Sequence, residues 1–234
     1  MVRSVERRFS IHFKFLLLGA AVLALAALFY WFSAGRNDPE QIIERAAKKQ
    51  ARLPGYHMQL NIVLNPGKSE SRYAVNVWFA KPGSYRVEMA SCNTDDQDSS
   101  RQVFVSDGIK AWVFSPEFND FMELNPTTSV VRHPPFLLTG FFDELARAEK
   151  KQYMETEIVN GTTCYRLQVL PQTPSFNRTK EEVWLSKASL TPVKIDTYCR
   201  NGQLRQTIEF NTFIKEPEIE EGFFSTQQLR LTGQ

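Results

Sequence analysis

The residues that could do acid–base chemistry are few and scattered along this sequence. Of the three histidines, the two beyond the N-terminal flank are His57, on the polar side of a predicted strand, and His133, beside a proline pair. No HExxH, GxGxxG, Walker or GxSxG motif occurs. The adjacent Glu181 and Glu182 would point to opposite faces of a strand, whereas a catalytic carboxylate pair must converge. We therefore expect these acids to be solvated, and we predict no catalytic residue, no cofactor and no enzyme activity.

Cysteine chemistry is limited as well. The three cysteines, Cys92, Cys164 and Cys199, allow at most one internal disulfide and one spare thiol. No two of them have the spacing of a CxxC redox or metal motif. We expect buried or singly paired cysteines and no metal site.

The charge balance excludes one class of partner. The 234 residues hold 28 basic and 26 acidic side chains, a net charge of +2, and the basic excess lies in the first 14 residues. A nearly neutral domain without a basic stripe has no electrostatic reason to bind nucleic acid. We therefore predict no nucleic acid partner.

A membrane segment is predicted near the N-terminus. The 18 residues from Phe15 to Phe32 carry no charge. A segment of this length is long enough for a helix that crosses the bilayer. The basic flank before them favours a cytoplasmic N-terminus. We predict a cytoplasmic flank at 1–14, a transmembrane anchor or signal segment at 15–35, and an extracytoplasmic domain at 36–234, in a single-pass protein of the cytoplasmic membrane. The small residues Ser33 to Gly35 leave cleavage of a signal peptide open.

The hydropathy pattern of the domain predicts two helices and eleven strands. Capping residues from Asn37 to Glu40 begin a helix that Pro54 ends. A second helix is expected over Phe136 to Gln152, where apolar residues recur at intervals of three and four. Residues 214–234 remain unassigned. Period-two alternation predicts strands at 56–64, 73–79, 85–89, 102–105, 109–114, 121–124, 155–159, 162–170, 180–185, 192–199 and 203–213.

Alternating strands leave one apolar face that must be covered. Eleven such strands have to close or curl to keep that face dry. The second helix is rich in Phe and Leu, so it is either ordinary core or a lid over a lipid-sized cavity. If it is a lid, only one of Phe141 and Phe142 should face the cavity, because neighbouring helical positions are about 100° apart.

Two segments resemble a known family. VWFAKPGSYRVE, from Val77 to Glu88, is followed by FVSDGIKAWVFSPE, from Phe104 to Glu117. In sequence and order they resemble the outer-membrane lipoprotein carrier (LolA-like) family. The resemblance implies a mainly β fold of the α+β class, an eleven-stranded, antiparallel, incompletely closed barrel with an N-terminal helix and a central lid helix. It also implies binding of membrane lipid or lipoprotein acyl chains on the concave face.

The resemblance implies the residues of the site. In the family, a basic residue before the motif proline latches the lid, and Lys81 stands at that position. The predicted lid residues are Leu137, Leu138, Phe141, Phe142 and Leu145. The predicted hydrophobic ligand-binding residues are Met58, Leu60, Ile62, Val75, Val77, Val87, Met89, Leu167, Val169, Ile195 and Phe210.

A second hypothesis follows from the predicted anchor. Soluble carriers of the family are released, whereas this chain is predicted to be tethered, and membrane-attached relatives in spore-forming bacteria bind a cell-wall amidase. The alternative is therefore a protein-interaction scaffold with a cell-envelope protein as partner. A carrier needs an unfilled apolar volume under the lid, whereas a scaffold can be packed with side chains.

Overall fold

The main hydrophobic core takes all of its residues from the stretch between Ile42 and Phe213. This stretch lies inside the unit Pro39–Gln234, which therefore carries its own core. The computed structural model describes residues 37–67, 69–93, 101–115, 120–124 and 137–227.

The predicted flank at 1–14 and membrane segment at 15–35 lie outside the described residues. Among the helices of the described residues, none has the combination of length and hydropathy that a membrane-spanning helix requires. The anchor and the boundary at residue 36 therefore stay predictions.

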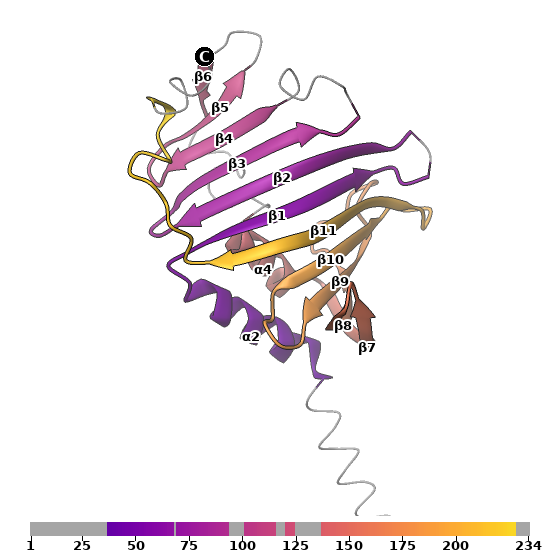
Figure 1. Cartoon of the computed structure of the whole chain (residues 1–234). Coiled ribbons are helices and arrows are strands. Elements are labelled where there is room, and N and C mark those ends of the chain that lie inside the picture. Colours follow the sequence, from indigo (N-terminus) through magenta and orange to yellow (C-terminus); the bar gives the residue numbers. More distant parts are fainter. Residues whose placement is uncertain (1–36, 68, 94–100, 116–119, 125–136, 228–234) are drawn as a thin grey trace, which may run out of the picture. The chain divides into compact units, whose positions relative to one another are not determined.

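The described strands form one antiparallel sheet of eleven strands, in the order β6-β5-β4-β3-β2-β1-β11-β10-β9-β8-β7 (Figure 1). The edges β6 and β7 do not pair with each other, so the sheet is not closed. This confirms the predicted mainly β, incompletely closed architecture. The strands are β1 (Gly55–Leu64), β2 (Ser71–Ala80), β3 (Ser84–Ser91), β4 (Gln102–Asp107), β5 (Ala111–Ser115), β6 (Asp120–Glu123), β7 (Lys150–Val159), β8 (Thr162–Leu170), β9 (Lys180–Ser186), β10 (Pro192–Tyr198) and β11 (Leu204–Lys215).

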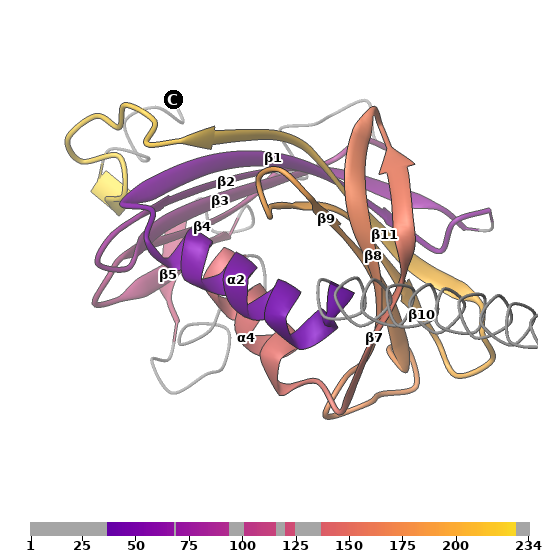
Figure 2. The ribbon, with the colours of Figure 1, turned by 90° about the horizontal axis from the view of Figure 1, so that it is seen from below.

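The sheet joins the two ends of the domain at its centre. β1 pairs with β11 from Tyr56 opposite Lys215 to Leu64 opposite Gln206. Two helices of the described residues, α2 (Pro39–Ala51) and α4 (Leu138–Arg147), lie side by side on the concave face of the curved sheet (Figure 2). The apolar side chains of the concave face are therefore shared between contacts with the helices and any space left beneath them.

Helix α2 (Pro39–Ala51) confirms the predicted N-terminal helix. Proline suits its first position because the missing N–H would have no helical partner there. Its apolar stripe, Ile42, Ile43 and Ala46, is buried in the main core. The side chain of Gln50 donates to the backbone oxygen of Leu190 at 3.3 Å, which fastens the helix to the turn between β9 and β10.

Helix α4 (Leu138–Arg147) is shorter than predicted. The predicted C-terminal end of this helix, around Lys150, belongs instead to the edge strand β7. The amide of Glu149 donates to the oxygen of Leu170 at 2.9 Å, and Lys150 is already opposite Leu170 in the sheet. Pairing with β8 therefore overrides a local preference for helix, which sequence spacing alone does not reveal.

Candidate ligand-binding cavity

A cavity of about 590 Å³ lies between the concave face of the sheet and helix α4. Its wall combines side chains from both halves of the sheet, from the helix and from the loop between β8 and β9. The lining residues are Met58, Leu60, Ile62, Leu64, Val75, Val87, Met89, Phe104, Leu137, Leu138, Phe141, Glu144, Leu145, Asn177, Arg178, Glu181, Ile195, Thr197, Arg205, Gln206, Ile208 and Phe210.

The apolar part of the wall is built as rows across the strands. Ile62 on β1 is opposite Ile208 on β11, which is in turn opposite Ile195 on β10. Leu60 opposite Phe210 forms the next row. Because side chains two residues apart share a face of a strand, the alternation in the sequence places these rows together inside the curve.

One end of the cavity is polar. Two residues along the strands from the isoleucine row, Gln206 on β11 is opposite Thr197 on β10, which is opposite Glu181 on β9. The hydroxyl of Thr197 lies 3.4 Å from a carboxylate oxygen of Glu181. The cavity therefore has an apolar body and a polar end, and this distribution of polarity matches that of an amphiphile.

Arg178 closes the polar end against the helix. Its guanidinium donates to both oxygens of Glu181, at 2.7 and 3.0 Å, and to Glu144 of α4 at 2.6 Å. Burial lowers the pKa of Arg178, but the hydrogen bonds and charges of the two carboxylates outweigh it and raise the pKa above its ordinary value. The arginine stays charged and connects α4 to β9.

Sequence reasoning missed this polar end. The signal was present, because Glu181, Thr197 and Gln206 continue the period-two alternation of strands whose other inward positions are apolar. A polar residue at an inward position is the informative exception to the pattern. Arg178 and Arg205 could not be placed in this way, since one lies in a loop and the other at an irregularity of β11.

Most of the predicted hydrophobic residues line the cavity. They come from β1, β2, β3, β10, β11 and the region of α4. The residues that the structure brings together are Met58, Leu60, Ile62, Val75, Val87, Met89, Ile195, Phe210, Leu137, Leu138, Phe141 and Leu145. Whether they bind a ligand stays a prediction.

Four predicted positions do not line it. Val77, Leu167 and Val169 are at most 1% exposed and belong to the packed core that also contains Ile42 of α2. Phe142 is likewise 1% exposed. These four side chains are packed among other core residues and do not border the free space, and whether they bind a ligand stays a prediction.

The two phenylalanines of α4 divide the roles. Phe141 lines the cavity, and Phe142 lies in the core, with ring centres 5.0 Å apart in an edge-on contact. At the start of the helix, the buried amide of Leu138 donates to the hydroxyl of Tyr56 at 3.0 Å. The helix therefore buries one aromatic ring in the core and presents the other to the cavity.

The predicted latch residue lies apart from these contacts. Lys81 is exposed, and its backbone amide donates to Pro54 at 2.8 Å. Its side chain makes no hydrogen bond or ion pair with any residue that the structure describes. At the polar end of the cavity, an ion pair between Arg178 and Glu144 does reach α4.

The histidine chemistry considered above finds no support in the geometry. His57 stacks on Trp78 with ring centres 4.5 Å apart, and its Nε2 lies 3.3 Å from Asn76 Oδ1 on the convex face. His133 lies outside the described residues. In the ranges that the structure describes, no group of three His, Cys, Asp or Glu side chains could hold a metal ion.

The acidic pair is placed as predicted but is not solvated. Glu181 lines the cavity, whereas Glu182 bonds to Arg166 at 2.7 Å on the convex face. Both residues are only 7% exposed, which corrects the expectation of solvated charge. The reason is that basic side chains of β8, β9 and the preceding loop lie within bonding distance of both carboxylates.

The cysteines form no disulfide among themselves. Cys92 is exposed, whereas Cys164 and Cys199 are buried. Burial raises the pKa of the Cys164 thiol above its ordinary value, which disfavours the reactive thiolate.

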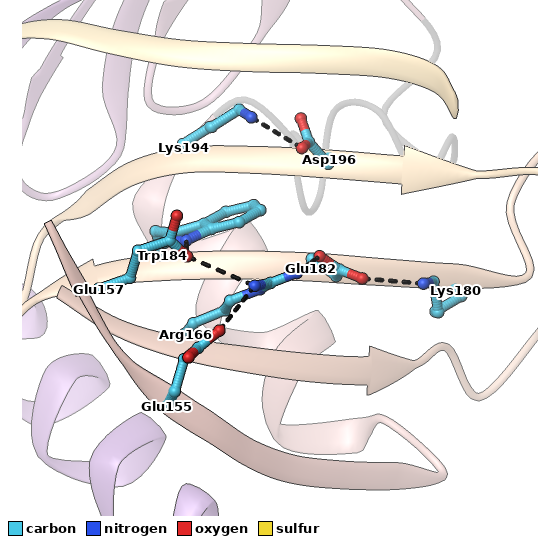
Figure 3. Close-up of polar contacts among 8 residues, drawn as sticks. All are labelled: Glu155, Glu157, Arg166, Lys180, Glu182, Trp184, Lys194 and Asp196. Carbon is cyan, nitrogen blue, oxygen red and sulfur yellow. Dashed lines mark hydrogen bonds and ion pairs between the residues drawn. The ribbon is translucent and has the colours of Figure 1, made fainter. Parts of the chain in front are cut away.

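A second polar cluster covers the convex face of β7 to β10 (Figure 3). Arg166 donates to Glu155 at 2.9 Å and to Glu182 at 2.7 Å. Trp184 lies between Arg166 and Lys194, whose charged groups are 5.3 and 4.8 Å from its ring centre. Trp184 is therefore only 4% exposed. The charged side chains cover its ring, so a ligand has no free surface to bind there.

Solved structures of other proteins are similar to this one. A conserved protein of Thermus thermophilus is 10% identical with a TM-score of 0.55, over 79% of this chain and 90% of that one. MucB in complex with MucA(peri) is 16% identical with a TM-score of 0.50, over 80% of this chain and 59% of MucB. A LolA superfamily protein from Nitrosomonas europaea is 15% identical with a TM-score of 0.41, over 81% and 98% of the two chains.

The architecture that the resemblance implied is present in the sheet itself, and the Thermus protein and MucB, with TM-scores of 0.55 and 0.50, share this fold. At these identities the likeness shows the architecture alone, and it leaves the predicted membrane-anchored form untested. No curated protein matches the sequence. Residues 94–230, more than half of the chain, match the model of a family described as "Uncharacterized protein". The chain therefore belongs to that family.

Proposed function

We propose that this protein binds membrane lipid or lipoprotein acyl chains in the cavity beneath α4 and catalyses no reaction. The observation that carries the proposal is the unfilled apolar volume of about 590 Å³, which is within the range of roughly 300–1,000 Å³ typical of small-molecule sites. Each methylene buried there would contribute about 0.8 kcal/mol. A hydrocarbon chain is the ligand that such a wall favours.

The location proposed for this activity is the outer side of the cytoplasmic membrane. The support is the uncharged run from Phe15 to Phe32 after a basic flank. The protein should remain in the membrane after carbonate extraction, and protease added to spheroplasts should digest the domain. Carbonate-soluble protein that begins near Arg36 would instead indicate a cleaved signal segment.

Binding can be tested on the compact unit Pro39–Gln234, which carries its complete core. We expect saturable binding of a dansylated fatty acid, measured by fluorescence. Met89→Trp should block it, because Met89 lines the cavity and the larger ring would fill the space. Met154→Trp is the matched control, since Met154 is 44% exposed on the edge strand. Equal binding by both variants would contradict the proposal.

The alternative is an envelope scaffold that binds a protein partner. MucB, a protein of the same fold, is found in complex with MucA(peri), so this fold can serve a protein partner. On this chain, the exposed Ile158 of the edge strand β7 would suit such a contact. A scaffold needs no empty interior, however, so this alternative does not account for the cavity.

A further inference from the structure

Arg205 is brought to the cavity by an irregularity of β11. Thr197 of β10 is opposite Gln206, but the next residue, Tyr198, is opposite Leu204. Arg205 is therefore the extra residue of a β-bulge, and a bulge changes the direction of the side chain that it contains. Strict alternation would place Arg205 on the face opposite to Gln206, yet both residues line the cavity.

The charges at the polar end are unequally matched. Four charged residues line the cavity, and three of them bond to one another, with Arg178 between Glu144 and Glu181. Arg205 is half-buried, and its side chain makes no hydrogen bond or ion pair with any residue that the structure describes. A guanidinium does not lose its charge in proteins, and leaving it unpaired beside an apolar wall is costly.

An anionic group would satisfy this guanidinium. The planar fork of arginine matches the two oxygens of a carboxylate or a phosphate, and such charge-assisted hydrogen bonds are stronger than neutral ones. From the polar row at Gln206, the apolar rows of Ile208 and Phe210 lead away along the same strand. A chain attached to the anion can therefore lie along these rows.

We propose that the cavity selects amphiphiles with an oxyanion headgroup, which Arg205 binds while the chain lies against the apolar rows. The proposal rests on the proposed function, since it names the class of acyl ligand. A fatty-acid carboxylate and a lipid phosphate share the required chemistry.

The test compares ligands that share one chain length. Dodecanoate, dodecyl phosphate and dodecanol compete with the methyl ester of a dansylated fatty acid for the unit Pro39–Gln234. We expect at least one of the two anions to compete about tenfold better than dodecanol, which corresponds to one charge-assisted hydrogen bond. The stronger of the two anions identifies carboxylate or phosphate as the source.

Variants separate the guanidinium from the rest of the cavity. Arg205→Gln should reduce the preferred anion to the level of dodecanol and leave dodecanol itself unchanged. Arg205→Lys should keep most of the preference because it keeps the charge. Arg200→Gln, in the exposed turn before β11, is the matched control and should behave like the parent.

The outcomes distinguish the two proposals. Equal competition by all three compounds, or a preference that persists in Arg205→Gln, overturns the headgroup assignment and leaves acyl binding intact. Absence of saturable binding of the ester and the fatty acid to the parent overturns the proposed function itself. Thermal melts of each variant establish whether it is folded. If Arg205→Gln does not fold, Arg205→Lys takes its place in the test, and loss of the anion preference in that variant overturns the headgroup assignment.

Discussion

The two faces of β9 and β10 are built from alternate residues of the same strands, but they differ in packing: the concave face borders free space, whereas the convex face is covered by its own side chains. Inward, Val183 and Ile195 are apolar, and space remains beside Ile195. Outward, Trp184 and Lys194 pack against each other across the strands with no comparable space over the indole. Concave curvature separates the inward side chains from the opposite wall, whereas outward side chains have only their neighbours to cover them.

This difference indicates where a ligand can bind. On the convex face the charged side chains of Figure 3 have partners, so a ligand there would have to break existing contacts. On the concave face a ligand fills empty volume and meets the unmatched charge of Arg205. Ligand binding is therefore expected on the concave face. The stability of the fold should depend on the buried side chains of both the concave and the convex face.

The largest effect is expected where the concave face is packed. Phe142→Ala should lower the free energy of unfolding by about 3–5 kcal/mol, since the ring is fully buried and its removal leaves a cavity. Phe141→Ala should cost clearly less, because its ring already borders empty space, and should weaken binding of the fatty-acid probe. Urea denaturation and a probe titration measure both. Equal destabilisation without loss of binding would favour the scaffold alternative.

The strands and the division within α4 could be predicted because they depend on local spacing. The eleven strands follow from period-two alternation, and only one of Phe141 and Phe142 faces the cavity because of the helical period. The same local rule failed at Lys150, where a basic residue suited to a helix end is instead paired with Leu170 of β8. Long-range pairing decided that boundary.

The cavity itself was only partly predictable. Alternation identified the inward residues, but it could not tell Val77, which is fully buried in the core, from Val75, which borders the cavity. That distinction depends on how the elements pack in three dimensions. The bulge at Arg205 also depends on the pairing of β10 with β11, so the unmatched charge emerges only in three dimensions.

The next largest effect is expected on the convex face. Arg166→Leu should lower the free energy of unfolding by about 2–3 kcal/mol, because the buried carboxylate of Glu182 loses a hydrogen-bond partner and the ring of Trp184 loses its cover. The double variant Arg166→Leu with Glu182→Leu should recover part of this loss, since it removes the buried carboxylate that the single variant deprives of Arg166. Urea denaturation at neutral pH gives the coupling. Additive losses would show that the pair contributes nothing specific.

A smaller effect concerns the pH dependence of the same pair. Burial raises the pKa of Glu182, but hydrogen bonds from Lys180 and Arg166 outweigh it, so the pKa lies below its ordinary value of 4.5. A lowered folded-state pKa contributes stability above the unfolded pKa, and this is lost as the pH falls through the folded value. In Glu182→Gln the free energy of unfolding should therefore fall less steeply below about pH 4.5 than in the parent. Parallel curves would contradict this.

The smallest effect tests what holds α4 over the cavity. The side chains of Arg178 and Glu144 are 36% and 40% exposed, so this ion pair resembles a surface pair, worth roughly 0.2–1 kcal/mol. Glu144→Gln should therefore speed release of the fatty-acid probe by at most about fivefold, measured by stopped-flow displacement. Lys81→Ala should leave the release rate unchanged, because no described residue of α4 bonds to that side chain. Faster release in Lys81→Ala than in Glu144→Gln would instead restore Lys81 as the latch that the family resemblance implied.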